Sequence, residues 1–273
     1  MVNISIITIN KNNANGLQKT IESIRQQTYT DIEHIIIDGG STDDSVSIIK
    51  RHYDSTQIEV KWISEPDSGI YSAMNKGIRL STGKYLQFLN SGDVLCNGDV
   101  AQVMSDELES KQTPPILYGN MIKAYPNGTT IKDMGFQGKK INFFDMFSGT
   151  LNHSSAIIYK QLFEQHGYYD ESFRIVSDWI WYYKVILEHK IDPVYVNIDV
   201  STFDMTGISN TNHKLEKEER SRFLKTVMPE YIYDDYKGRA YSIKQINRIQ
   251  THNMAWKCFN ILDTITKKIE NVF

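Results

Sequence analysis

The sequence has few cysteines and no long apolar run. Cys96 and Cys258 are its two cysteines, and neither a CxxC pair nor a zinc-like spacing accompanies them. A disulfide framework is therefore not expected, and a reducing, cytoplasmic compartment fits. No stretch reaches about 18 uninterrupted apolar residues, so the sequence predicts no membrane-spanning helix. The first residues lack the basic segment of a signal peptide, and we expect none.

The chain also lacks an excess of either charge. Its 30 Lys and Arg residues and 33 Asp and Glu residues give a net charge of -3, which offers no support for a nucleic-acid partner. No GxGxxG follows the first predicted strand, and this argues against a dinucleotide-binding dehydrogenase. With 273 residues, 40% of them apolar, the chain is long enough for one large globular domain, alone or with a helical appendage.

Strand and helix patterns alternate over the first 95 residues. The β-branched run at residues 4–9 is typical of a strand covered on both faces, and shorter apolar runs predict strands at 34–38, 58–62 and 85–89. Residues at helical spacing separate these strands. Repeated strand–helix units of this length predict a mostly parallel sheet with helices on its faces and right-handed crossovers.

The pattern changes after residue 112. A turn at residues 126–128 predicts a hairpin, and an aromatic-rich helix is expected at 177–189. Further strands are predicted at 116–120, 154–159 and 194–198.

A helical and charged pattern begins near residue 214. We therefore expect an α/β domain of residues 1–210, with halves at 1–95 and 96–210, followed by a C-terminal helical extension of residues 211–273. In that extension, one helix face is apolar and lysines lie outside it. The face is expected to lie on an anionic membrane surface or to pack against the core. Its apolar residues are Cys258, Leu262, Ile265 and Ile269, and the lysines are Lys257, Lys267 and Lys268.

Asp38 stands at the carboxyl end of the second predicted strand, followed by Gly39, Gly40 and Ser41. A carboxylate at this place accepts hydrogen bonds from a base N–H or a ribose hydroxyl, and the two glycines let a ligand approach the backbone. The alternative is an ordinary turn between a strand and a helix.

A second polar loop, at residues 65–69, precedes the helix predicted at 70–80. Asp67 is suited to orient a base or ribose, while the helix N-terminus at Gly69 is suited to face phosphates. Asn75 and Lys76 lie on this helix, and Lys76 is a second candidate for phosphate contact. The alternative is a capping Asp and an exposed Lys.

The fourth predicted strand ends in Asn90, Ser91, Gly92 and Asp93. A hard divalent ion takes oxygen ligands and bridges to a diphosphate while using one or two protein carboxylates, and Asp93 fits that role. Asn90 is suited to hydrogen-bond to a sugar or a metal-bound water. The alternative is a surface turn.

Two candidate residues lie in the second half. His153 precedes a strand and is a candidate metal ligand, phosphate ligand or acceptor contact, or else a structural histidine. Asp178 begins an apolar helix beside Trp179 and Trp181, where it is a candidate general base or a helix cap. Burial would raise its pKa and the helix N-terminus would lower it, so the sequence leaves the balance open. Residues 203–212 form a polar segment that is expected to act as a lid or a plain connector.

The order of these segments resembles glycosyltransferase family 2, especially bacterial members that build surface polysaccharides. The resemblance covers residues 3–210. Segments resembling the nucleotide-binding half are 5–10, 37–45, 65–77 and 88–93, and those resembling the acceptor half are 153–155, 169–173 and 177–179.

The resemblance implies a GT-A fold, a Rossmann-like α/β architecture, and inverting transfer from a nucleotide-sugar donor, with UDP as the expected nucleotide. It implies that Thr8, Asn10 and Asp38 bind the base and ribose, and that Asp67 helps to hold the nucleotide. The motif that ends at Asp93 would bind the diphosphate through Mg²⁺ or Mn²⁺. Asp178 would be the base. The implied acceptor is a glycan or lipid-linked oligosaccharide at the inner face of the cytoplasmic membrane.

Three departures from the family pattern stand out. The first strand has no Pro, Ser177 rather than Glu or Ala precedes Asp178, and Asp93 is the lone acid of a motif that often has two or three. The lone acid leaves open a non-catalytic sugar- or nucleotide-binding protein on a decayed scaffold, which Asp178 and His153 oppose. A sugar-phosphate nucleotidyltransferase is a further alternative, but it would need a basic Gly-rich loop where residues 12–16 are neutral.

Overall fold

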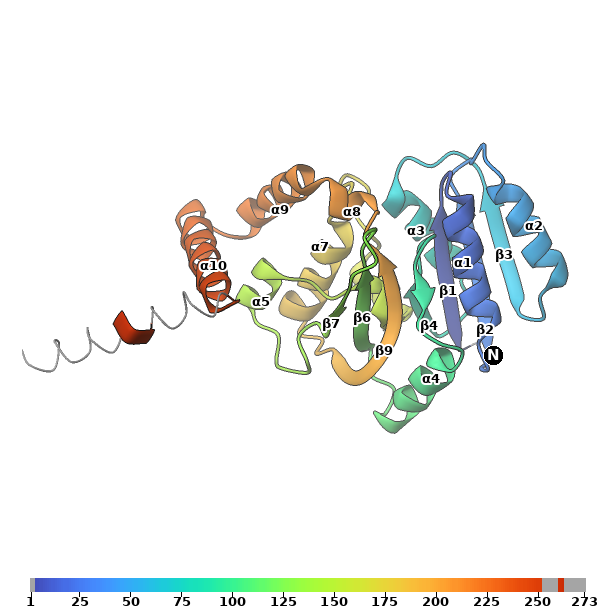
Figure 1. Ribbon diagram of the computed structural model, residues 1–273, viewed down its shortest axis with the longest axis horizontal. Helices are drawn as coiled ribbons and strands as arrows, with labels where there is room; N and C mark the ends of the chain where they lie inside the picture. Colours follow the sequence, from blue (N-terminus) through green and yellow to red (C-terminus); the bar gives the residue numbers. More distant parts are fainter. Residues whose placement is uncertain (1–2, 252–259, 263–273) are drawn as a thin grey trace, which may run out of the picture. The chain divides into compact units, whose positions relative to one another are not determined.

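The computed structural model describes residues 3–251 and 260–262. Its centre is a nine-stranded mixed sheet with the order β3-β2-β1-β4-β8-β6-β9-β5, and β7 pairs with β6 (Figure 1). The strands are β1 Ile4–Asn10, β2 Ile32–Asp38, β3 Glu59–Ser64, β4 Tyr85–Phe88, β5 Val94–Leu95, β6 Ile116–Ala124, β7 Thr130–Asp133, β8 Ala156–Tyr159 and β9 Val194–Asp204.

The first four strands are all parallel, as the sequence predicts. Three helices connect them: α1 Ala14–Arg25, α2 Ser45–Ser55 and α3 Ile70–Leu80. Neighbouring residues of a strand point to opposite faces of the sheet, so helices that pack on alternate positions lie on opposite faces. Ile36 packs with side chains of α1 and α2, whereas Ile7 lies against Gly77 of α3, where an added Cβ would come within 2.4 Å of the Ile7 side chain. Both faces are therefore covered, which explains the continuous apolar runs of β1 and β2.

The second half is mixed. β8 is antiparallel to both β4 and β6, β9 is parallel to β6, and β5 is antiparallel to β9. The predicted hairpin is confirmed, since β6 and β7 pair in antiparallel fashion around the turn. Where the β6–β9 register shifts, Gly119 permits close approach, because a Cβ there would lie 2.6 Å from the carbonyl oxygen of Ile198.

Several elements differ from the expectation. The sequence patterns did not predict β5, α4 Val100–Ser110, α5 Phe143–Ser148 or α6 Gln161–His166. The expected strand at 154–159 starts later, because His153–Ser155 form a 3-10 turn. The expected helix at 177–189 is α7 Ser177–Tyr183 followed by a π-helical turn, Lys184–Glu188. β9 extends to Asp204, six residues beyond the predicted end at 198, because it pairs with β6 along this length.

The expected C-terminal helices are confirmed as α8 Ile208–Thr211, α9 His213–Val227 and α10 Glu230–Thr251. Residues 1–220 form one compact unit and residues 221–273 another. Within the first unit, Glu219 of α9 accepts hydrogen bonds from the backbone N–H groups of Arg174 and Ile175. The division at residue 210 stays a prediction.

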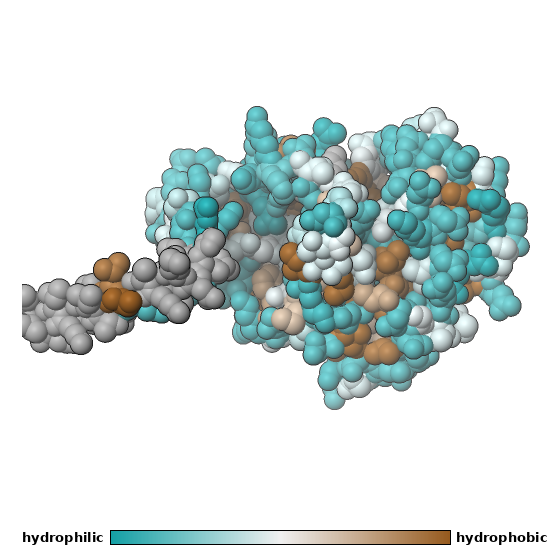
Figure 2. All heavy atoms as spheres, viewed as in Figure 1, coloured by the Kyte–Doolittle hydropathy of each residue, from teal (hydrophilic) through white to brown (hydrophobic). Residues whose placement is uncertain are grey.

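The described helices include none that is long and apolar enough to cross a membrane. Of the predicted apolar face, Leu262 is exposed, whereas Cys258, Ile265 and Ile269 lie outside the described residues, as do the three flanking lysines. On the face shown in Figure 2, hydrophilic residues cover most of the surface and hydrophobic residues lie in small groups between them.

Candidate active site

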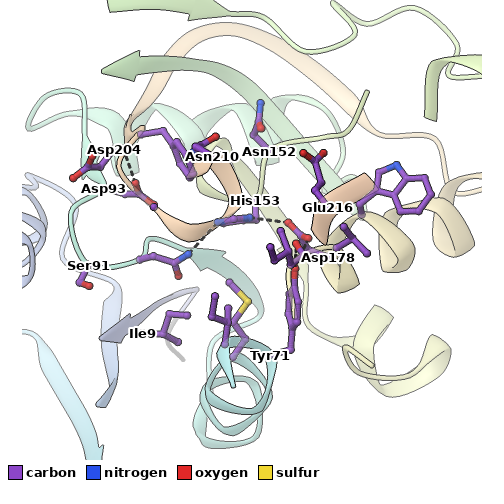
Figure 3. Close-up of a pocket in the computed structure, with 18 of the residues that line it drawn as sticks. Ile9, Tyr71, Ser91, Asp93, Asn152, His153, Asp178, Asp204, Asn210 and Glu216 are labelled. Carbon is purple, nitrogen blue, oxygen red and sulfur yellow. Dashed lines mark hydrogen bonds and ion pairs between the residues drawn. The ribbon is translucent and has the colours of Figure 1, made fainter. Parts of the chain in front are cut away.

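A cavity of about 730 Å³ opens at the edge of the sheet where β1 and β4 end. This is the edge at which open α/β sheets bind ligands, because loops and helix N-termini gather there. Seven of the predicted site residues line it: Asn10, Asp67, Gly69, Asn90, Asp93, His153 and Asp178. The structure thus brings both predicted halves of the site to one cavity (Figure 3).

The other predicted site residues do not line this cavity. Thr8 is buried and donates to the backbone oxygen of Leu89. Asn75 is buried and donates to the Tyr169 carbonyl and the Glu171 carboxylate, so it ties α3 to the second half of the chain. The remaining five are Asp38, Gly39, Ser41, Lys76 and Gly92.

Asp38 is fully buried and its carboxylate is fully engaged. It accepts hydrogen bonds from Nδ2 of Asn10 at 2.8 Å, Oγ of Ser64 at 2.7 Å, and both the backbone N–H and Oγ of Ser41 at 2.9 and 2.5 Å. Burial raises the pKa of Asp38, but these hydrogen bonds outweigh it and hold the pKa below its usual value. In this structure the carboxylate orders the loop after β2 and orients Asn10.

Asp67 and Lys76 form an ion pair beside the cavity. Nζ of Lys76 lies 2.6 Å from Asp67 and 2.7 Å from Glu65, so the lysine holds the loop onto α3. Gly39 lets this loop approach, because a Cβ at that position would lie 3.1 Å from the Asp67 carboxylate. The Asp67 carboxylate therefore sits at the cavity wall in a fixed position.

Asp93 is a buried carboxylate, only 3% exposed, whose ionised form is destabilised by its surroundings. Its Oδ1 accepts from the backbone N–H of Asp204 at 2.9 Å, while its buried Oδ2 has no hydrogen-bond partner within the part of the chain that the structure describes. Burial raises the pKa of Asp93 to about 7, and the nearby Asp204 carboxylate adds to the rise. Gly92, with φ of +108°, lies against the Asp204 side chain.

Asp204 was missed as a site residue by the sequence analysis. It ends β9, within the segment considered as a lid, and it lies beside Asp93 although 111 residues separate the two. The described residues include no group of three or more His, Cys, Asp or Glu side chains that could hold a metal ion. However, two carboxylates suffice for Mg²⁺ or Mn²⁺ when substrate phosphates and water complete the shell, and the unpartnered Oδ2 of Asp93 fits that donor set.

His153 uses both ring nitrogens in hydrogen bonds. Nδ1 lies 3.0 Å from Oδ2 of Asp178 (Figure 3). Nε2 lies 3.2 Å from the Asn90 side-chain nitrogen. Burial lowers the pKa of His153, but the hydrogen bond and charge of Asp178 outweigh it, so its pKa is raised. In this arrangement His153 contacts the candidate base through one ring nitrogen and Asn90 through the other, and its role as a metal ligand stays a prediction.

Asp178 lies in the first turn of α7, between two donors. Oδ1 accepts from the Tyr71 hydroxyl at 2.7 Å, and Oδ2 faces His153. Burial raises the pKa of Asp178, but the hydrogen bond and positive charge of His153 and the hydrogen bond from Tyr71 outweigh it, so the pKa stays below its usual value. Asp178 is therefore an ionised carboxylate in a fixed orientation, as a proton acceptor must be.

Further cavity residues have no local sequence signal. Tyr71 lies on α3, and Glu216 and Arg220 lie on α9. In the expected lid segment, residues 203–207 and Asn210 line the cavity. Closure of this segment stays a prediction.

The mixed sheet with helices on both faces and the cavity at its loop-and-helix edge define an α/β protein with a candidate ligand site where such folds bind their ligands. The sequence pattern of Glycosyl transferase family 2 matches residues 5–166, and the chain belongs to this family. This confirms the predicted family, the GT-A fold and the enzyme class, a glycosyltransferase.

Relatives support the same class. An uncharacterized glycosyltransferase of Mycobacterium tuberculosis (strain H37Rv) is 32% identical over 209 residues, which cover 76% of this chain and 77% of that protein. A PGL/p-HBAD biosynthesis glycosyltransferase of Mycobacterium bovis (strain BCG / Pasteur 1173P2) is 26% identical over 210 residues, which cover 76% and 79%.

Two solved structures share the fold at 14% identity. S. aureus TarS 1-349 in complex with UDP-GlcNAc matches with a TM-score of 0.60 over 74% of this chain and 58% of that chain. The mannosyltransferase PcManGT from Pyrobaculum calidifontis, in complex with GDP-Man and Mn²⁺, matches with a TM-score of 0.57 over 73% and 56%. This chain therefore aligns with less than two thirds of the length of either.

Proposed function

We propose that this protein is an inverting glycosyltransferase that moves a sugar from a nucleotide-diphosphate donor, with UDP as the expected nucleotide, to a hydroxyl of a glycan or lipid-linked acceptor. The observation that carries this proposal is the placement of Asp178 in the same cavity as Asp67 and Asp93. A carboxylate that is ionised and oriented thus shares one space with the residues expected to hold the donor.

The donor side is formed by the ends of β1 and β4 and the N-terminus of α3. Asn10, Asp67 and the backbone at Gly69 are proposed to contact the nucleotide, and the N-terminus of α3 favours negative charge there. Asp38 and Ser41 are proposed to act indirectly, because their hydrogen bonds set the loop and Asn10. The two structural neighbours bind UDP-GlcNAc and GDP-Man, which supports a nucleotide sugar as donor.

Asp93 and Asp204 are proposed to hold a divalent ion, Mn²⁺ or Mg²⁺. Such an ion would neutralise charge on the diphosphate when bound. The structure of PcManGT with GDP-Man and Mn²⁺ supports this choice of ion. Asp204 also weakens the case for a decayed scaffold, since that alternative depends on Asp93 being the lone acid of the site.

The proposed chemistry is a single displacement. A carboxylate oxygen of Asp178 takes the proton of the acceptor hydroxyl, and the hydroxyl oxygen forms a bond to the anomeric carbon. The bond from that carbon to the diphosphate oxygen breaks, and the nucleoside diphosphate leaves with the electron pair. Attack from the opposite side inverts the anomeric configuration. General base catalysis of this kind typically contributes about 10²–10⁴-fold.

The cellular setting is part of the proposal. A lipid-linked oligosaccharide of a surface-polysaccharide pathway would place the protein in the cytoplasm, at the inner face of the membrane. The C-terminal helices would then make peripheral contact, and packing of these helices against the core is the alternative.

A thermal-shift screen with nucleoside diphosphates tests the donor assignment. Each of UDP, GDP, ADP, CDP and dTDP is added with and without Mn²⁺. A ligand that binds the folded state stabilises it, so one base is expected to raise the melting temperature more than the others, and more with Mn²⁺. If no nucleotide raises it under either condition, the proposed function fails.

A further inference from the structure

One side of the cavity lies away from Asp93 and Asp204, which are proposed to hold the ion of the donor diphosphate (Figure 3). Figure 3 shows Glu216 on the side of the cavity where Asp178 lies, with Asp93 and Asp204 across it. The acceptor hydroxyl must reach Asp178, so the space on this side is where the rest of the acceptor would lie. Glu216 and Arg220 of α9 line it together with Asn152.

Glu216 and Arg220 form an ion pair one helical turn apart. Nε of Arg220 lies 3.3 Å from Oε1 of Glu216, and the guanidinium lies 4.6 Å above the ring of Trp179. The indole of Trp179 is fixed because its N–H donates to the Met146 carbonyl at 2.7 Å. The guanidinium plane is therefore held against a rigid aromatic surface, which is a geometry that Lys cannot reproduce.

The hydrogen-bonding capacity of this pair is largely unused. An arginine has five N–H donors. Among the described residues, the buried Nε of Arg220 approaches Glu216 without forming a hydrogen bond, and one terminal nitrogen makes a long contact of 3.5 Å to the Gly149 carbonyl. Glu216 adds acceptor oxygens directly beside these donors, with a side chain that is 31% exposed.

From this geometry we propose that Glu216 and Arg220 form the acceptor subsite and that they bind a pair of adjacent hydroxyls on a neutral sugar ring. One hydroxyl would donate to the Glu216 carboxylate while its neighbour accepts from the Arg220 guanidinium. The charges on this side cancel in pairs, Arg220 with Glu216 and His153 with Asp178. Because these pairs leave no net positive charge, an acidic sugar or a phosphate would gain no electrostatic attraction on this side, so the subsite favours a neutral acceptor.

This inference rests on the proposed function, and its test separates the two. Nucleoside diphosphate release is measured with the donor identified by thermal shift, first with water as acceptor and then with methyl glucoside, galactoside and mannoside. The corresponding methyl uronides are the anionic probes. In the wild-type protein, neutral glycosides are expected to stimulate release more than uronides.

Glu216→Gln and Arg220→Lys are expected to raise the KM for the neutral glycoside about tenfold or more, as for loss of a hydrogen bond to a charged group. The Kd of the nucleoside diphosphate should remain at the wild-type value, because neither residue is proposed to contact the donor. Glu218→Gln is the matched control, because Glu218 forms an ion pair of the same spacing with Lys214 on α9 but does not line the cavity.

Three results would overturn the subsite: preference for uronides, acceptor kinetics in the two variants equal to those of Glu218→Gln, or no response to any neutral glycoside while the wild-type protein hydrolyses the donor. Absence of both donor binding and donor hydrolysis in the wild-type protein would instead refute the proposed function.

Discussion

Removal of the Tyr71 hydroxyl tests how the structure tunes the proposed base. The hydroxyl donates to Oδ1 of Asp178 at 2.7 Å and lies 2.5 Å from the backbone oxygen of Ile175. A hydrogen bond to a charged group contributes about 1.5–3 kcal/mol, which corresponds to about a 10- to 100-fold change in the ratio of protonated to ionised Asp178. The bond favours the ionised form, so its loss raises the pKa of Asp178.

Tyr71→Phe is therefore expected to shift the acidic limb of the kcat/KM pH profile to higher pH. Activity should fall most at acidic pH, where the variant is protonated and the wild-type base is still ionised. At alkaline pH, where both are ionised, the two proteins should differ little. The assay is the pH dependence of nucleoside diphosphate release at subsaturating donor, with melting temperature recorded to confirm folding at each pH.

Tyr169 provides a matched control for this variant. Its ring lies 5.5 Å from that of Tyr71, and it is equally buried, but its hydroxyl has no hydrogen-bond partner in the described part of the chain. Tyr169→Phe should leave the acidic limb unchanged. The claim that the Tyr71 hydroxyl lowers the pKa of Asp178 is refuted if Tyr71→Phe keeps the wild-type pH profile, or if Tyr169→Phe shifts the profile by the same amount.

Three further predictions concern the buried acids. Asp38→Ala should lower the free energy of unfolding, measured in urea, by about 3–5 kcal/mol, because buried donors lose their charged acceptor. Folding lowers the pKa of Asp38, so this stabilisation is present at neutral pH and is lost as the pH falls. An equal loss of unfolding free energy at pH 7 and pH 3 would contradict it. Asp93→Asn should raise the melting temperature of the metal-free protein more at pH 8 than at pH 5, because the raised pKa of about 7 means that folding penalises the ionised form. A variant that melts below the wild-type protein at pH 8 would contradict this. Asp204→Asn should raise the Mn²⁺ concentration needed for half-maximal activity by roughly tenfold, measured by metal titration, and an unchanged titration would remove Asp204 from the ion site.

Local patterns predicted the strands and helices of residues 1–95 well. The β-branched run of β1 and the apolar run of β2 need no partner to be identified, because both faces of these strands are covered. α4 was overlooked although Val100, Met104 and Leu108 are buried at helical spacing.

Several site residues depend on contacts between distant parts of the chain, which local sequence patterns do not contain. A motif such as Asp38-Gly39-Gly40-Ser41 fits both a ligand contact and a self-satisfied turn, and only the hydrogen bonds of the folded chain distinguish them. For Asp178, the local pattern left a general base and a helix cap equally open, and the family resemblance favoured the base. Asp204 joins Asp93 through pairing of distant strands, and Tyr71 reaches Asp178 across the domain, so neither leaves a signal in its own neighbourhood.

In the proposed mechanism, Asp178 removes the acceptor proton while other residues hold the donor. Asp178→Asn tests this division of roles, with calorimetry of nucleoside diphosphate and Mn²⁺ binding measured on the same protein as transfer. We expect a loss of transfer of about 10²–10⁴-fold with an unchanged Kd. Transfer at the wild-type rate, or weakened nucleotide binding with normal residual turnover, would contradict it.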